Sequence, residues 1–122
     1  MKKLLLLSLL LVSSHVHADG VLIRGHAFVP KCEAAVTYFD THEEVYSGFA
    51  NVCLFFIHGV TESLRSLEML DGKQARICRF AYFGGEPAAR AVIEYAEQNP
   101  ESLDWPAIDL VLAVMKSKYP CQ

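Results

Sequence analysis

The chain has 122 residues, 52% of them hydrophobic, and a formal net charge of −3 from 11 Lys and Arg against 14 Asp and Glu. This length is enough for one domain with a single modest core and too short for two. The sequence has no basic run that would follow a phosphate backbone, so its composition argues against a nucleic-acid partner.

The first 18 residues have the pattern of a cleavable secretory signal peptide. Lys2 and Lys3 form a cationic start, and an apolar run from Leu4 to Val12 follows. The run is about half of the ~20 residues that a membrane-spanning helix needs, so an uncleaved anchor is the less favoured alternative. We predict cleavage after Ala18, with no stable membrane anchor, which leaves residues 19–122 as a domain that folds outside the cytosol. That domain has nine Lys and Arg against fourteen Asp and Glu, a formal charge of −5.

All cysteines of the chain follow the predicted cleavage site. An even number of cysteines in a small exported domain indicates two disulfides, for which three pairings are possible. The spacing includes no CxxC pair and no haem-attachment pattern, so a zinc ribbon or a thioredoxin-type site lacks support. The four residues are Cys32, Cys53, Cys78 and Cys121.

The first half of the mature sequence predicts two helices. After an apolar but irregular stretch, Pro30 opens a first helix that ends near Asp40. Thr41, with Glu44 three residues later, has the pattern of a capping box for a second helix over about residues 42–67. We expect one apolar stripe of this helix to face the core; it consists of Val45, Phe49, Val52, Cys53, Phe56, Ile57 and Val60.

The second half predicts a long connection and two further helices. Turn signals at both ends mark the connection, over about residues 66–86. Proline at the helix-opening position then indicates a third helix over about 87–99 and a fourth over about 106–119. The sequence therefore predicts an all-α fold, a compact bundle of about four helices with two disulfides.

A bundle of this order favours one of the three disulfide pairings. Cys32 on the first helix and Cys53 on the second can meet if the two helices are antiparallel neighbours, which leaves Cys78 for Cys121. Closing loops of roughly 20 and 40 residues stabilises a fold by about 3 to 4 kcal/mol each in the chain-entropy model.

The residues that would carry catalysis or bind a metal have ordinary alternatives. With every cysteine assigned to a disulfide, and no GxSxG or HExxH motif, a hydrolase lacks support, and no cofactor or metal is expected. The mature histidines are His26, His42 and His58. A group of carboxylates has helical spacing, for which a solvated face is favoured over a metal site; it consists of Glu94, Glu97 and Glu101.

The long connection is rich in aromatic and Arg residues, the usual anchors of protein interfaces. Either these aromatics are buried under the bundle, or they form a protruding loop that recognises a partner. The candidate partner-binding residues are Arg76, Arg79, Phe80, Tyr82 and Phe83.

Residues spread over almost the whole mature chain carry a family resemblance. They are Cys53, Leu54, Phe56, Ile57, Gly59 and Val60, then Cys78, then Val92, Ile93, Tyr95, Asn99, Pro100 and Glu101, then Ala107, Leu110, Val111, Tyr119, Pro120 and Cys121. Over about residues 28–121 the chain resembles the Rap/Tai family of type VI secretion immunity proteins. The long connection, with Arg79 and Phe80, departs from the usual family pattern.

The resemblance implies a periplasmic, all-α, disulfide-bonded protein that is not an enzyme. Such proteins bind and inhibit a peptidoglycan amidase effector that neighbouring cells deliver, and they usually do so as homodimers. The alternative is a periplasmic helical binding protein, or a chaperone-like stress protein, without a dedicated effector.

Overall fold

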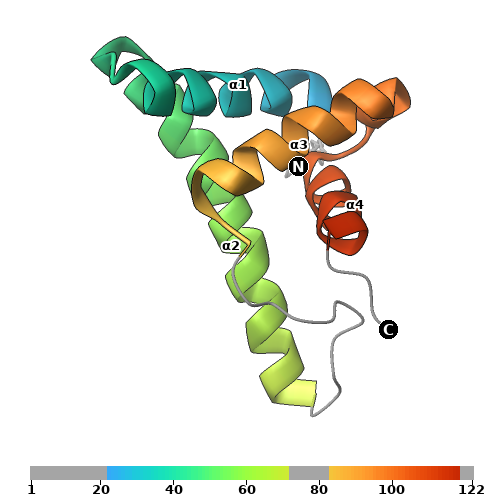
Figure 1. The fold of residues 1–122 in the computed structure, drawn as a ribbon. Coiled ribbons are helices and arrows are strands. Elements are labelled where there is room, and N and C mark those ends of the chain that lie inside the picture. The colour runs from blue at the N-terminus through green and yellow to red at the C-terminus, as the bar shows by residue number, and fades with distance from the viewer. Residues whose placement is uncertain (1–21, 72–82, 119–122) are drawn as a thin grey trace, which may run out of the picture.

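The computed structural model describes residues 22–71 and 83–118, and this part of the chain is helical (Figure 1). Its elements are α1 (Gly25–Thr41), the 3₁₀ helix η1 (Glu44–Tyr46), α2 (Ser47–Asp71), α3 (Gly85–Gln98), the 3₁₀ helix η2 (Pro100–Asp104) and α4 (Ala107–Lys118). Within those two ranges the only β-type pairing is an isolated bridge between Arg24 and Pro106. The predicted all-α fold is thus confirmed, whereas the predicted signal peptide lies outside the described residues.

The core forms where α1 crosses α2 and α3. α1 packs most extensively against these two helices, and the C-terminal half of α2 extends beyond the crossing (Figure 1). α4 completes the core with Leu110, Val111, Val114 and Met115, all fully buried. Small residues on the buried side of α3 let this helix approach its neighbours closely; they are Ala88, Ala89, Ala91 and Ala96.

A disulfide joins α1 to α2 inside this core. The Cys32 and Cys53 Cα atoms are 5.0 Å apart, and both residues are fully buried. This confirms the Cys32–Cys53 pairing, while Cys78 and Cys121 lie outside the described residues and their disulfide stays a prediction. A bridge across 21 residues stabilises the fold by about 3 kcal/mol in the chain-entropy model.

Helix α1 begins five residues before the expected start at Pro30. The Arg24 carbonyl accepts hydrogen bonds from the Ala27 and Phe28 N–H groups, at 3.0 and 2.9 Å. The Gly25 N–H donates to the Trp105 carbonyl at 2.9 Å, so a distant segment fixes the first turn. Pro30 lies exposed inside the helix, where the carbonyl that it leaves without a donor can be hydrated.

The predicted capping box at Thr41 and Glu44 is wrong. Thr41 is the last residue of α1, and its hydroxyl donates to the Thr37 carbonyl at 2.8 Å. His42 then turns the chain in the left-handed region with φ 58°, and its N–H donates to the Tyr38 carbonyl at 2.7 Å. The Thr41 hydroxyl also accepts a hydrogen bond from the Glu43 N–H at 3.3 Å, but no helix begins at His42, and α2 starts only at Ser47.

Part of the apolar stripe that was predicted to face the core from α2 is exposed. Val45, Phe49 and Val52 are 72%, 51% and 42% exposed, so their assignment to the core is wrong. Cys53, Ile57 and Val60 of the same stripe are buried as predicted, and Ala50 and Thr61, which the stripe did not include, are buried with them. α2 thus has two apolar faces, and periodicity alone does not say which one meets α1.

The later helices agree closely with the prediction. α3 begins at Gly85, whose φ of 63° favours glycine, and α4 begins at Ala107 directly after Pro106. At the end of α3 the Asn99 N–H and its Nδ2 group both donate to the Tyr95 carbonyl at 2.9 Å. The short helix η2 follows and was not predicted; it carries the chain back to the N-terminal end of α1.

Candidate interaction surface

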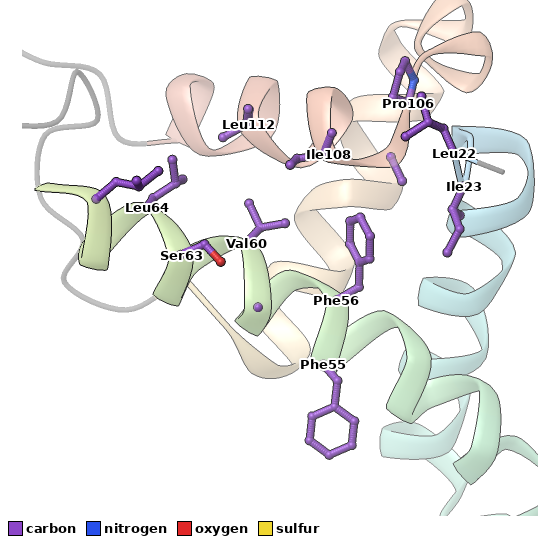
Figure 2. Close-up of a pocket in the computed structure, with 13 residues that line it drawn as sticks. Leu22, Ile23, Phe55, Phe56, Val60, Ser63, Leu64, Pro106, Ile108 and Leu112 are labelled. Atoms are coloured by element: carbon purple, nitrogen blue, oxygen red, sulfur yellow. The ribbon is translucent and has the colours of Figure 1, made fainter. Parts of the chain in front are cut away.

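An apolar groove lies between α2 and α4, with a volume of about 680 Å³ (Figure 2). Ser63 supplies the only polar side chain among the residues that line it. The lining residues are Leu22, Ile23, Phe55, Phe56, Gly59, Val60, Ser63, Leu64, Leu67, Pro106, Ala107, Ile108 and Leu112. A volume of this size and an apolar lining are typical of a binding site.

The segment before α1 forms one end of the groove. The Ile23 carbonyl accepts a hydrogen bond from the Ala107 N–H at 2.6 Å, which holds Leu22 and Ile23 against the start of α4. The Arg24 guanidinium donates to the Asp104 carbonyl at 2.6 Å. These bonds join residues about 80 positions apart in the sequence, so only the folded chain forms this end of the groove.

A second apolar surface continues from the groove along α2. We call it the α2 face and define it by Gly48, Phe49, Val52, Phe55, Gly59, Ser63 and Leu67. Phe55, at the edge of the groove, is 70% exposed and points away from α4, whereas Phe56 and Val60 point toward α4 (Figure 2). Exposed apolar side chains that gather in this way mark a surface that contacts another molecule.

Cations lie at the edge of the α2 face and not within it. The Lys31 ammonium lies 4.2 Å from the centre of the Phe49 ring, in a cation–π contact that links α1 to α2. On the opposite edge, Arg65 and Glu62 form an ion pair at 3.4 Å. The α2 face is therefore uncharged but bordered by both signs of charge.

Ion pairs lie on the exposed side of α3. The Arg90 guanidinium donates hydrogen bonds to Glu86 and Asp40, each at 2.7 Å, and the bond to Glu86 is the main cause of its raised pKa. The Lys118 ammonium lies 3.0 Å from Glu94, and this hydrogen bond lowers the pKa of that carboxyl. Glu94 thus connects α3 to α4 through an exposed ion pair. This arrangement agrees with the solvated face that the sequence favoured over a metal site.

The described residues contain no group of three or more His, Cys, Asp and Glu side chains placed to hold a metal ion. His26 pairs with Asp104 at 3.1 Å on the surface, His42 ends α1, and His58 is exposed on α2. Both cysteines of these segments are joined in the disulfide and cannot act as nucleophiles.

Of the predicted partner-binding residues, only Phe83 lies in the described part of the chain. It is 6% exposed and belongs to the core, and its carbonyl lies 3.4 Å from the Thr61 hydroxyl, which donates to it. This burial favours packing over recognition for Phe83. Arg76, Arg79, Phe80 and Tyr82 lie outside the described residues, so their role stays a prediction.

Sequence reasoning missed the α2 face because it assigned Phe49 and Val52 to the core stripe and gave Phe55 and Leu67 no role. A signal was present: residues 52–57 are apolar at every position, which is more than one helix face can bury against one neighbour. Glycine at positions 48 and 59 of the same helix was a second signal, because glycine disfavours helix.

The fold and this surface define a class of protein: a small helical, disulfide-bonded domain with an uncharged surface suited to contact another molecule. None of the helices in the described ranges is long and apolar enough to cross a membrane.

A family model of Rap1a immunity proteins matches residues 24–121. The chain therefore belongs to the Rap1a immunity protein family, and the resemblance to Rap/Tai immunity proteins is confirmed. Membership implies immunity to a secreted effector. Comparisons with curated proteins and with solved structures find no match.

Proposed function

We propose that this protein is a periplasmic immunity protein that binds and inhibits a peptidoglycan amidase delivered by a type VI secretion system. The observation that carries the proposal is the family match over residues 24–121, which spans every described helix. The signal-peptide pattern of residues 1–18 supports export, and the Cys32–Cys53 disulfide suits an oxidising compartment.

The proposal assigns inhibition to binding and not to catalysis. An exposed apolar surface on a cross-linked scaffold can bind a partner with little loss of conformational entropy, because its backbone is already ordered. A homodimer is part of the same proposal.

Protection from the effector tests this function. A susceptible strain that makes a candidate peptidoglycan amidase effector in its periplasm, for example one encoded beside this protein's gene, should lyse, and co-production of this protein should prevent lysis. The purified proteins should bind, and the rate of peptidoglycan peptide cleavage should fall as this protein is added. Lysis that continues at full expression of the exported protein would refute the proposal.

A second candidate is a chaperone-like periplasmic protein, which the open apolar groove between α2 and α4 favours. It predicts suppression of aggregation of several unrelated unfolded proteins. An immunity protein predicts no such suppression, together with tight binding of one amidase.

Location is tested separately. Cell fractionation should recover the protein with the periplasmic contents, and N-terminal sequencing should begin at Asp19. A start at Met1 would contradict the predicted cleavage.

A further inference from the structure

The groove between α2 and α4 follows α2 for several turns. Ile108 and Leu112 line its α4 side, opposite Val60 and Leu64 of α2 (Figure 2). The lining residues of α2 lie between positions 55 and 67, which is about 18 Å of helix at a rise of roughly 1.5 Å per residue. With a volume of about 680 Å³, the groove has room for an extended chain along its length.

The lining of the groove suits a chain that has no hydrogen-bonding groups. Ser63 supplies the only polar side chain among the lining residues, so an extended peptide in the groove would leave many of its N–H and C=O groups without partners. An acyl chain has no such groups. Exposed apolar side chains lie at both ends of the groove, and covering them would remove apolar surface from water; Leu22, Leu67 and Ile108 are 64%, 56% and 45% exposed.

The two ends of the groove differ in charge. At the end formed by the segment before α1, the neighbouring charged side chains include two exposed carboxylates, Asp104 of η2 and Asp109 in the first turn of α4. The other end lies toward the last turn of α4, where Lys116 follows Ile108 and Leu112 at intervals of four residues and so lies on the same side of the helix.

Lys116 has no carboxylate of its own to neutralise it. It is exposed and forms no ion pair with any residue in the described ranges, whereas Lys118 of the same turn lies 3.0 Å from Glu94. An anionic group at this end of the groove would be attracted by Lys116, and at the other end it would be repelled by Asp109. The charges therefore favour one orientation of a ligand that has an apolar chain and one anionic end.

We propose that the groove between α2 and α4 binds a fatty acid, with the acyl chain against Ile108 and Leu112 and the carboxylate at the Lys116 ammonium. Burial of the chain supplies most of the affinity, because an exposed ion pair alone contributes little. Lys116 decides the direction in which the chain lies. This binding site is additional to the proposed immunity function and does not depend on it.

Calorimetric titration of the mature protein, residues 19–122, with sodium decanoate below its critical micelle concentration tests the inference. We expect saturable binding of one decanoate per chain, with the helical circular dichroism unchanged. Ile108→Glu should raise the dissociation constant by about tenfold or more, because it places a carboxylate against the acyl chain. Lys116→Glu should weaken decanoate binding in the same way but leave the affinity for 1-decanol unchanged, since the alcohol has the same chain length and no charge.

Two variants are matched controls. Val45→Glu places the same carboxylate on an exposed apolar residue outside the groove lining. Arg65→Glu makes the same change of charge as Lys116→Glu, but Arg65 pairs with Glu62 and does not line the groove. Both variants should bind decanoate like the wild type.

Several results would overturn the inference. They are no saturable binding of decanoate, loss of helical structure as decanoate binds, or unchanged decanoate affinity in either Ile108→Glu or Lys116→Glu. If Ile108→Glu abolishes binding of the amidase and decanoate does not compete with the amidase, the groove is a protein contact and not a fatty-acid site. The titration contains no effector, so failure of fatty-acid binding and failure of immunity are measured separately.

Discussion

A Cβ added to Gly25 would lie 2.7 Å from the Leu103 Cα, so the first residue of α1 touches the backbone of η2. No side chain fits this contact, and the obstacle is backbone on both sides. The close contact lets the first turn of α1 lie directly against η2, beside the Leu22–Ile23 segment at the end of the groove.

We predict that Gly25→Ala lowers the free energy of unfolding by about 1 to 3 kcal/mol, the range for overpacking a close contact. Urea denaturation of the mature protein measures this loss. Gly48→Ala is the control: its Cβ has open space, so helix propensity should raise the free energy of unfolding by about 0.5 to 1 kcal/mol. A Gly25→Ala protein as stable as the wild type would show that η2 can move away from α1.

Thiol titration under denaturing conditions should find no free thiol in periplasmic material. The Cys32–Cys53 disulfide accounts for two cysteines, and the predicted Cys78–Cys121 disulfide for the other two. Two titratable thiols would mean that only one disulfide forms and would refute the two-disulfide prediction. Peptide mapping after proteolysis without reduction would then identify which pair is oxidised.

Removing the buried disulfide should have a measurable effect on stability. The double variant Cys32→Ala and Cys53→Ala should lose about 3 kcal/mol or more, because the bridge closes a 21-residue separation and both sulfurs lie in the core. Equilibrium unfolding monitored by circular dichroism checks this. The wild type treated with reductant in denaturant, and then refolded, separates the loss of the bond from the loss of side-chain volume.

The Lys118 hydrogen bond lowers the folded-state pKa of Glu94, which makes this ion pair sensitive to pH. A lowered pKa contributes stability above the unfolded-state pKa, and that contribution is lost as the pH falls through the folded-state value. Glu94→Gln should therefore destabilise the protein near neutral pH and differ less from the wild type in acid. Thermal unfolding across pH 3 to 7, roughly the range over which carboxyls titrate, measures the difference.

The control for that experiment is Glu97→Gln on the same exposed side of α3, where the described residues show no ion pair with Glu97. It should leave the pH dependence unchanged. If Glu94→Gln matches the wild type at every pH, the ion pair adds no stability, as is common for exposed pairs.

Phe83 and Tyr82 are predicted to behave differently although they are adjacent. Phe83→Ala should lower the free energy of unfolding by about 3 to 5 kcal/mol, because a ring in the core is removed. Tyr82→Ala, which tests the predicted recognition segment, should keep the fold and weaken effector binding by about 2 kcal/mol or more. Calorimetry with the amidase and thermal unfolding of each variant separate these effects. A Tyr82→Ala protein with unchanged affinity would place recognition elsewhere.

The sequence by itself determined the all-α class, the positions of α3 and α4, and the pairing of Cys32 with Cys53. Each rests on a local signal: proline near the start of α3 and immediately before α4, helical spacing of apolar residues, or two cysteines on successive helices. The family resemblance rests on the same kind of signal, because motif residues keep their order along the chain whatever their environment in space.

Only the tertiary structure decided where α1 begins, how Thr41 is used and which face of α2 is buried. The N-terminal turn of α1 depends on a hydrogen bond between Gly25 and Trp105, and residues so far apart leave no local pattern. Val52 and Cys53 are neighbours on an apolar helix, yet one is exposed and the other buried, because burial depends on where α1 crosses α2 and not on hydrophobicity.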